Sequence, residues 1–107
     1  MTAESLDRDT VRSLKRIAHH LDPVVLVGEQ GVSEALIAET ERALADHELI
    51  KVRIHSGDRD TRRALADSLA EATNAAVVQS IGKVTVLFRR NPEPNPKLSN
   101  LVRFSGG

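Results

Sequence analysis

The sequence PVVLVGEQGVS, residues 23–33, determines how we expect the rest of the chain to fold. Its apolar run, Val24–Val27, contains three β-branched residues without alternation, which predicts a buried strand with both faces covered. Two glycines, Gly28 and Gly31, follow at once, and Ser33 can then cap a helix. A strand, a glycine loop and a helix start in this order direct unpaired backbone N–H groups toward one small volume, which suits a phosphate.

The glycine pair alone is a weak signal, because many strand-to-helix connections use two glycines for tight turning. Neither a P-loop motif nor the G-x-G-x-x-G motif of dinucleotide-binding proteins is present. The remaining phosphate-binding candidate is the short glycine loop that holds a nucleic-acid backbone, as in KH-type modules. The alternative is a plain connection between strand and helix.

The chain has 107 residues, enough for one domain with a single modest core. Its apolar runs are far shorter than the roughly 20 residues that span a bilayer, and residues 1–8 do not resemble a secretory signal. The absence of cysteine excludes disulfides, thiolate zinc sites and cysteine catalysis. We therefore expect a cytoplasmic protein without a membrane partner.

Fifteen basic and fifteen acidic residues give a formal net charge of zero, whereas a nucleic-acid-binding domain is usually basic. The charges are unevenly placed along the chain. Residues 82–107 carry five basic side chains against one acidic, and residues 34–48 carry five acidic against one basic. A basic face on one side of the molecule is therefore expected.

Hydrophobic periodicity predicts the element order α-β-α-β-α-β-β. Strand–helix–strand units need right-handed crossovers, so we expect a single compact α/β domain in which three helices accompany a four-stranded mixed sheet. The last two strands are close enough to form an antiparallel hairpin. In chain order the predicted elements are a helix over about 5–21, a strand at 24–27, a helix at 33–47, a strand at 49–55, a helix at 59–73, and strands at 76–81 and 83–89.

The strand predicted at 49–55 alternates cleanly, with apolar residues at the even positions from 50 to 54 and basic residues at the odd positions from 51 to 55. One face of this strand is therefore core, and the other is wet and basic. Beyond it, residues 91–96 read Asn-Pro-Glu-Pro-Asn-Pro, which cannot hold a helix or a central strand. We expect a domain at 1–90 and a proline-rich flexible tail at 91–107, with a short docking segment at 98–104.

Four motifs in one order extend these observations. They are L-K-x-x-A-H-x-L-x-P-V-V from Leu14, G-x-x-G from Gly28, H-E-L-I-K-V-R from His47 and Q-x-I-G-K-x-x-V-L-F-R from Gln79. Together, over about residues 5–90, they resemble the CRM domain, and in particular its stand-alone bacterial YhbY-type members. The resemblance implies an RNA-binding domain whose fold is similar to the C-terminal domain of the third bacterial translation initiation factor. It also implies association with maturing large ribosomal subunits and their ribosomal RNA.

In that family the glycine loop and neighbouring basic residues are the presumed RNA contact. Two departures predict a weaker RNA affinity here: the loop interior is Glu29-Gln30, and Asp22 stands where many relatives are basic. The candidate RNA-binding residues are Gly28, Glu29, Gln30, Gly31, Lys15, His19, Lys51, Arg53, Lys83 and Arg89.

Aromatic side chains are nearly absent, with no Trp or Tyr and two Phe, of which Phe88 is assigned to the core. Base stacking on a sheet, as in an RRM, is therefore not expected. Recognition by backbone amides, Arg and Lys would be led by phosphate and by the shape of the RNA.

An enzyme and a protein-binding adaptor are the two other classes of function to consider for this sequence. An enzyme is not expected, because no histidine pair has the i, i+4 spacing of a helical metal site and no nucleophile–base pair can be argued from spacing. Neither a metal nor a cofactor is expected. The alternative function is a protein-binding adaptor whose acidic helix, 33–47, docks ribosomal or assembly proteins. We expect a monomer whose main partner is RNA.

Overall fold

The computed structural model describes residues 6–55 and 57–104, apart from the side chain of Phe104. The strands are β1 (Pro23–Val27), β2 (Leu49–Ile54), β3 (Ala76–Ile81) and β4 (Val84–Phe88). The helices are α1 (Arg8–Ala18), α2 (Glu34–His47), α3 (Arg59–Ala72) and α4 (Asn100–Phe104). The strands form one mixed sheet in the order β1-β2-β4-β3, with β1 parallel to β2 and β4 antiparallel to both its neighbours. The predicted α/β class and element order are confirmed, and α4 is an addition.

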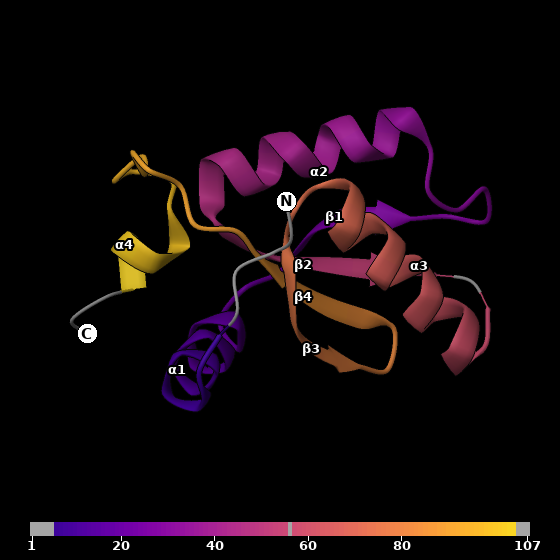
Figure 1. Cartoon of the computed structure of the whole chain (residues 1–107), viewed down its shortest axis with the longest axis horizontal. Coiled ribbons are helices and arrows are strands. Elements are labelled where there is room, and N and C mark those ends of the chain that lie inside the picture. Colours follow the sequence, from indigo (N-terminus) through magenta and orange to yellow (C-terminus); the bar gives the residue numbers. More distant parts are fainter. Residues whose placement is uncertain (1–5, 56, 105–107) are drawn as a thin grey trace.

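The sheet separates two apolar cores (Figure 1). On one face, α2 and α3 pack through Leu44 and Leu69 against the even-numbered side chains of β2. On the other face, α1 packs through Leu14 and Ala18 against Phe88 of β4. The helical spacing of these apolar residues is what places them on a single face of each helix.

β1 is an edge strand, and half of its side chains are exposed. Val25 and Val27 are buried beneath α2, whereas Val24 is 49% and Leu26 61% exposed on the opposite face. The prediction that both faces of this strand are covered was wrong, because α1 lies over β2 and β3 and leaves β1 uncovered. An all-apolar strand sequence does not show which face a helix covers.

Side chains at the N-caps fix where the three long helices begin. Asp7, Ser33 and Asp58 each accept a hydrogen bond from the backbone N–H three residues later. This is the usual way to satisfy an amide that has no partner within the helix. The hydrogen bond from the Thr61 N–H holds the pKa of Asp58 below its ordinary value.

The tail contacts the domain at Asn91 and again from Leu98 onward, whereas the proline-rich residues 92–97 between them are exposed. The Glu48 carboxylate, only 2% exposed, accepts hydrogen bonds from the Asn91 N–H and the Ser99 hydroxyl, both at 2.7 Å. Asn100 donates to the Leu49 carbonyl at 2.7 Å, and its neighbour Leu101 packs against the α1 core. The expected docking segment at 98–104 therefore contains the contacts of Ser99, Asn100 and Leu101, and Asn91 makes a further contact before it.

Candidate nucleic-acid interface

The glycine loop, residues 28–31, is a tight turn at the end of β1. The Gly31 N–H donates to the Gly28 carbonyl at 3.1 Å, and Gly31 has φ of 73°, a conformation that favours glycine. A Cβ on Gly28 would meet nothing within 4 Å, so this corner is open. Over residues 6–55 and 57–104, no backbone hydrogen bond uses the amides of Glu29 and Gln30. The Gly28 amide also donates in none of these bonds, so the loop has three such N–H groups, whereas that of Gly31 is used within the turn.

The end of the sheet next to this loop also carries the β3–β4 turn. The His55 N–H donates to the Val27 carbonyl at 2.9 Å, which ties the end of β2 to the start of the loop. The Ile54 N–H donates to the Lys83 carbonyl at 2.7 Å, which places Lys83 at the same end. In Figure 1 the loop after β1 and the turn between β3 and β4 both lie at the right of the sheet, away from α1.

Lys51 and Arg53 of β2, and His55 directly after this strand, follow one another on the face toward α1. Leu49 is buried beneath α1, Lys51 is half-buried, and Arg53 and His55 are exposed. Side chains on one face of a strand are about 7 Å apart. Lys51, Arg53 and His55, which we call the β2 cationic track, therefore form a line from α1 to the glycine loop.

The track begins at a groove beside α1. Lys15 and His19, one helical turn apart, line this groove together with Lys51 and the edge of the β3–β4 hairpin. Its volume is about 330 Å³. The structure thus brings three of the predicted site residues together and places Arg53 next in line toward the glycine loop.

A row of paired residues crosses the sheet and meets the track at Arg53. Leu26 pairs with Arg53, Arg53 with Val84, and Val84 with Ile81. Leu26 and Ile81 are 61% and 65% exposed, so apolar surface flanks the Arg53 guanidinium on both sides. This row was not predicted from the sequence, because apolar residues in strands look like core residues. An exposed apolar surface of this kind is a typical sign of a binding site.

Arg89 does not belong to this surface. Its guanidinium donates to Glu41 Oε2 at 2.7 Å and to the Thr73 carbonyl at 3.0 Å, and its side chain is only 21% exposed. It follows the end of β4 that pairs with Leu49, so it lies at the opposite end of the sheet from the glycine loop. The structure therefore gives Arg89 a role in joining α2, α3 and β4, and does not bring it together with the other predicted site residues.

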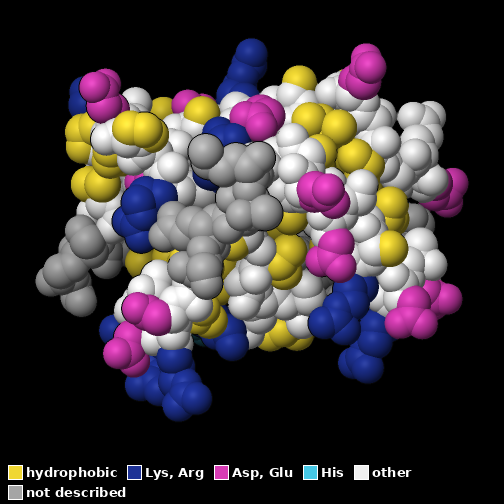
Figure 2. All heavy atoms as spheres, viewed as in Figure 1, with side chains coloured by type: hydrophobic (Ala, Val, Ile, Leu, Met, Phe, Trp, Pro, Cys, Tyr) yellow, Lys and Arg dark blue, Asp and Glu magenta, His cyan; other side chains and the backbone are white. Residues whose placement is uncertain are grey.

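Basic side chains are spread over the face shown in Figure 2. Lys and Arg side chains form two groups along the lower edge of the molecule, and others lie at its upper edge and on the left, with Asp and Glu side chains among them. Within the described part of the chain, no three His, Asp or Glu side chains come together as metal ligands. No helix there is long and apolar enough to cross a membrane.

Comparison with known proteins gives consistent matches. A family model described as the CRS1/YhbY (CRM) domain matches residues 6–89. A Pseudomonas aeruginosa protein named "Probable RNA-binding protein" is 49% identical over 102 residues, which cover 95% of this chain and 98% of that protein. An "RNA-binding protein" of Haemophilus influenzae is 45% identical over 85 residues, covering 79% and 86%. The solution structure of a hypothetical protein from Staphylococcus aureus matches with a TM-score of 0.75 and 34% identity, covering 89% of this chain and 98% of that one. Neither of the two named relatives carries the name of an enzyme.

Proposed function

Because the chain belongs to the CRS1/YhbY (CRM) domain family, we propose that it binds RNA through the sugar–phosphate backbone, with the β2 cationic track as the central contact. The names of its relatives support RNA as the ligand. In this proposal the RNA is ribosomal and is bound in precursors of the large subunit. The observation that carries the proposal is the line of basic side chains from the α1 groove to the open glycine loop.

The chemistry of the track suits a phosphodiester chain. Lys51 supplies a compact charge, and the planar fork of Arg53 can hold two phosphate oxygens at once. The amides of Glu29 and Gln30 offer donors at the end of the line. The Glu29 carboxylate opposes a phosphate there, so the loop contributes less than the track.

A salt titration tests this proposal. We expect the affinity of the protein for fragments of large-subunit ribosomal RNA to fall as salt rises, with a slope of about 0.7–0.9 in log affinity per log salt for each phosphate contact. The double variant K51Q/R53Q should lower that slope by about 1.4–1.8. A matched control, R42Q/K97Q, removes two exposed charges from α2 and the tail and should leave the slope unchanged. A slope near zero for the parent protein would contradict the proposal.

The large-subunit assignment has its own test, which is to identify the particles that co-sediment with the protein from cells. Precursors of the large subunit are the expected result. Recovery of other RNAs alone would restrict the proposal to RNA binding.

The adaptor alternative loses part of its support. Of the acidic residues in and next to α2, Glu41 pairs with Arg89 and Glu48 is buried beneath the tail. Fewer carboxylates are therefore available to a basic protein than the sequence indicated. Binding to a basic ribosomal protein, combined with a flat salt response toward RNA, would favour the adaptor.

A further inference from the structure

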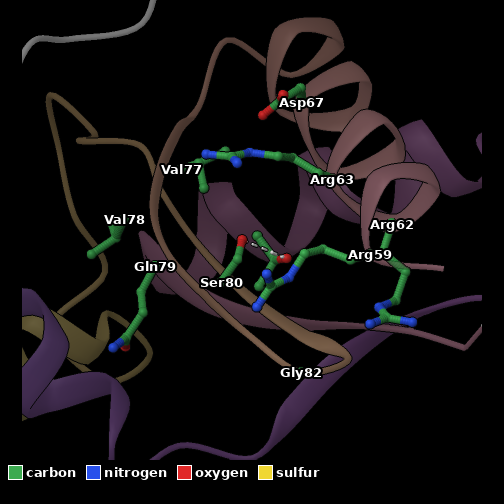
Figure 3. A pocket seen from close by; sticks show the side chains of 10 residues that line it. Arg59, Arg62, Arg63, Asp67, Val77, Val78, Gln79, Ser80 and Gly82 are labelled. Carbon is green, nitrogen blue, oxygen red and sulfur yellow. Dashed lines mark hydrogen bonds between the residues drawn. The ribbon is translucent and has the colours of Figure 1, made fainter.

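A second hollow lies across the β3–β4 hairpin from the α1 groove. It has a volume of about 600 Å³ and opens between the beginning of α3 and the hairpin (Figure 3). We call it the arginine hollow and define it by Arg59, Arg62, Arg63, Asp67, Ser80 and Thr85. None of these residues was among the predicted site residues.

The floor of the hollow carries two hydroxyl groups. Ser80 and Thr85 are partners across the hairpin, and their hydroxyl oxygens lie 3.2 Å apart. One hydroxyl proton is used between them, so the pair retains a second proton to donate. In Figure 3 the side chain of Arg59 reaches from α3 toward this pair, and that of Arg63 extends toward Val77.

Two of the three guanidinium groups are free. Arg62 is anchored, because it donates to the Gly57 carbonyl at 2.6 Å, and its buried Nε has no hydrogen-bond partner. Arg59 and Arg63 are exposed, and neither forms an ion pair with an acidic residue in the described part of the chain. Asp67, one turn beyond Arg63, is the only acidic residue among those lining the hollow. The hollow is therefore a place of net positive charge.

We propose that the arginine hollow binds a second phosphate group of the bound RNA, so that the RNA backbone crosses the β3–β4 hairpin from the α1 groove to α3. This inference rests on the proposed function. Side chains that alternate along β3 and β4 supply both surfaces, and Lys83 stands in the turn between them. The two guanidinium forks can each hold the non-bridging oxygens of a phosphodiester, and the hydroxyl pair adds a further donor. RNA is the favoured occupant because the hairpin that forms one wall of the hollow also forms the edge of the α1 groove.

The double variant R59Q/R63Q tests the inference in the same salt titration with ribosomal RNA fragments. Because the hollow holds one phosphate group in this inference, the double variant should bind the RNA about 5- to 8-fold more weakly at 0.1 M salt. Its salt slope should be lower than that of the parent by about 0.7–0.9. R42Q/K97Q again controls for net charge. Both arginines are exposed, so thermal unfolding followed by circular dichroism should be unchanged. A second readout is the amide resonances of Ser80 and Thr85, which should shift when inorganic phosphate or the RNA is added.

The outcomes separate the two proposals. If the affinity of the parent falls steeply with salt and R59Q/R63Q has the same affinity and slope, the hollow does not bind phosphate. The proposed function would then still stand. A parent without salt dependence would overturn both. If the amide resonances of Ser80 and Thr85 shift with a polyglutamate peptide and not with RNA, the hollow binds an acidic protein partner. That result would also overturn the inference.

Discussion

Replacing Arg89 with glutamine separates a structural role from an RNA-binding one. The guanidinium joins three elements, because it forms an ion pair with Glu41 on α2 and a hydrogen bond with the Thr73 carbonyl after α3. The ion pair is partly exposed, at 21% and 46% for the two side chains, so its contribution stays within about 1 kcal/mol. The hydrogen bond adds about 1 kcal/mol. We therefore expect R89Q to lower the free energy of unfolding by about 1–2 kcal/mol.

Urea unfolding measures this loss, and the salt titration measures RNA binding under conditions where the variant remains folded. We expect the salt slope of R89Q to equal that of the parent. The matched variant R53Q should behave in the opposite way, with parental stability and a slope lower by about 0.7–0.9. If R89Q is as stable as the parent and its salt slope is lower by about 0.7–0.9, Arg89 binds phosphate and its proposed structural role is refuted.

Five further variants test the loop, the tail and one helix cap. G28A should be as stable as the parent, because its Cβ meets no atom within 4 Å and its φ is not in the left-handed region. It should bind RNA more weakly in the salt titration, because the added methyl group stands where the RNA backbone approaches the loop. G31A should lower the free energy of unfolding in urea by about 1 kcal/mol, because φ at this position is 73°. E29K should tighten RNA binding, and unchanged or weaker binding would place the phosphate elsewhere. E48A should lower the free energy of unfolding by about 3 kcal/mol, since two hydrogen bonds to a buried carboxylate are lost, and a loss below about 1 kcal/mol would contradict the docked tail. D58N should be less stable than the parent at pH 7, and the difference measured by thermal unfolding should disappear as the pH falls below about 4, because a carboxyl with a lowered pKa stabilises the fold only while it is ionised.

Local periodicity was sufficient to predict the element order. The apolar stripes of the helices and the alternation of β2 depend on neighbours within a few residues, and the short turn at Gly82 left an antiparallel hairpin as the simplest connection. Periodicity could not show which strands each helix covers on either face of the sheet. β1 and β3 are edges, so Leu26 and Ile81 are exposed although their residue types are those of a core.

The candidate site shows the same division between local and long-range information. Lys51 and Arg53 were predicted correctly to share a face because strand alternation is local. Arg89 has the same residue type and also follows a strand, but its partner Glu41 is 48 positions away in the sequence. The partners of the tail are equally remote, since Ser99 reaches Glu48 across 51 positions. No pattern of spacing predicts such pairs.

The net charge of zero was the strongest argument against a polyanionic ligand, and the structure shows why it carries little weight. A phosphate responds to charges within about a Debye length, roughly 10 Å at 0.1 M salt, rather than to the sum over the chain. Several acidic residues are already used within the fold: Asp7 and Asp58 cap helices, Glu41 pairs with Arg89, and Glu48 holds the tail. Among the described residues, Lys51 and Arg53 of the track and Arg59 and Arg63 of the arginine hollow form no ion pair, whereas Arg62 donates to the Gly57 carbonyl. A neutral protein can therefore present a locally positive surface, because these four carboxylates are used within the fold while Arg59 and Arg63 are exposed and form no ion pair with a described residue.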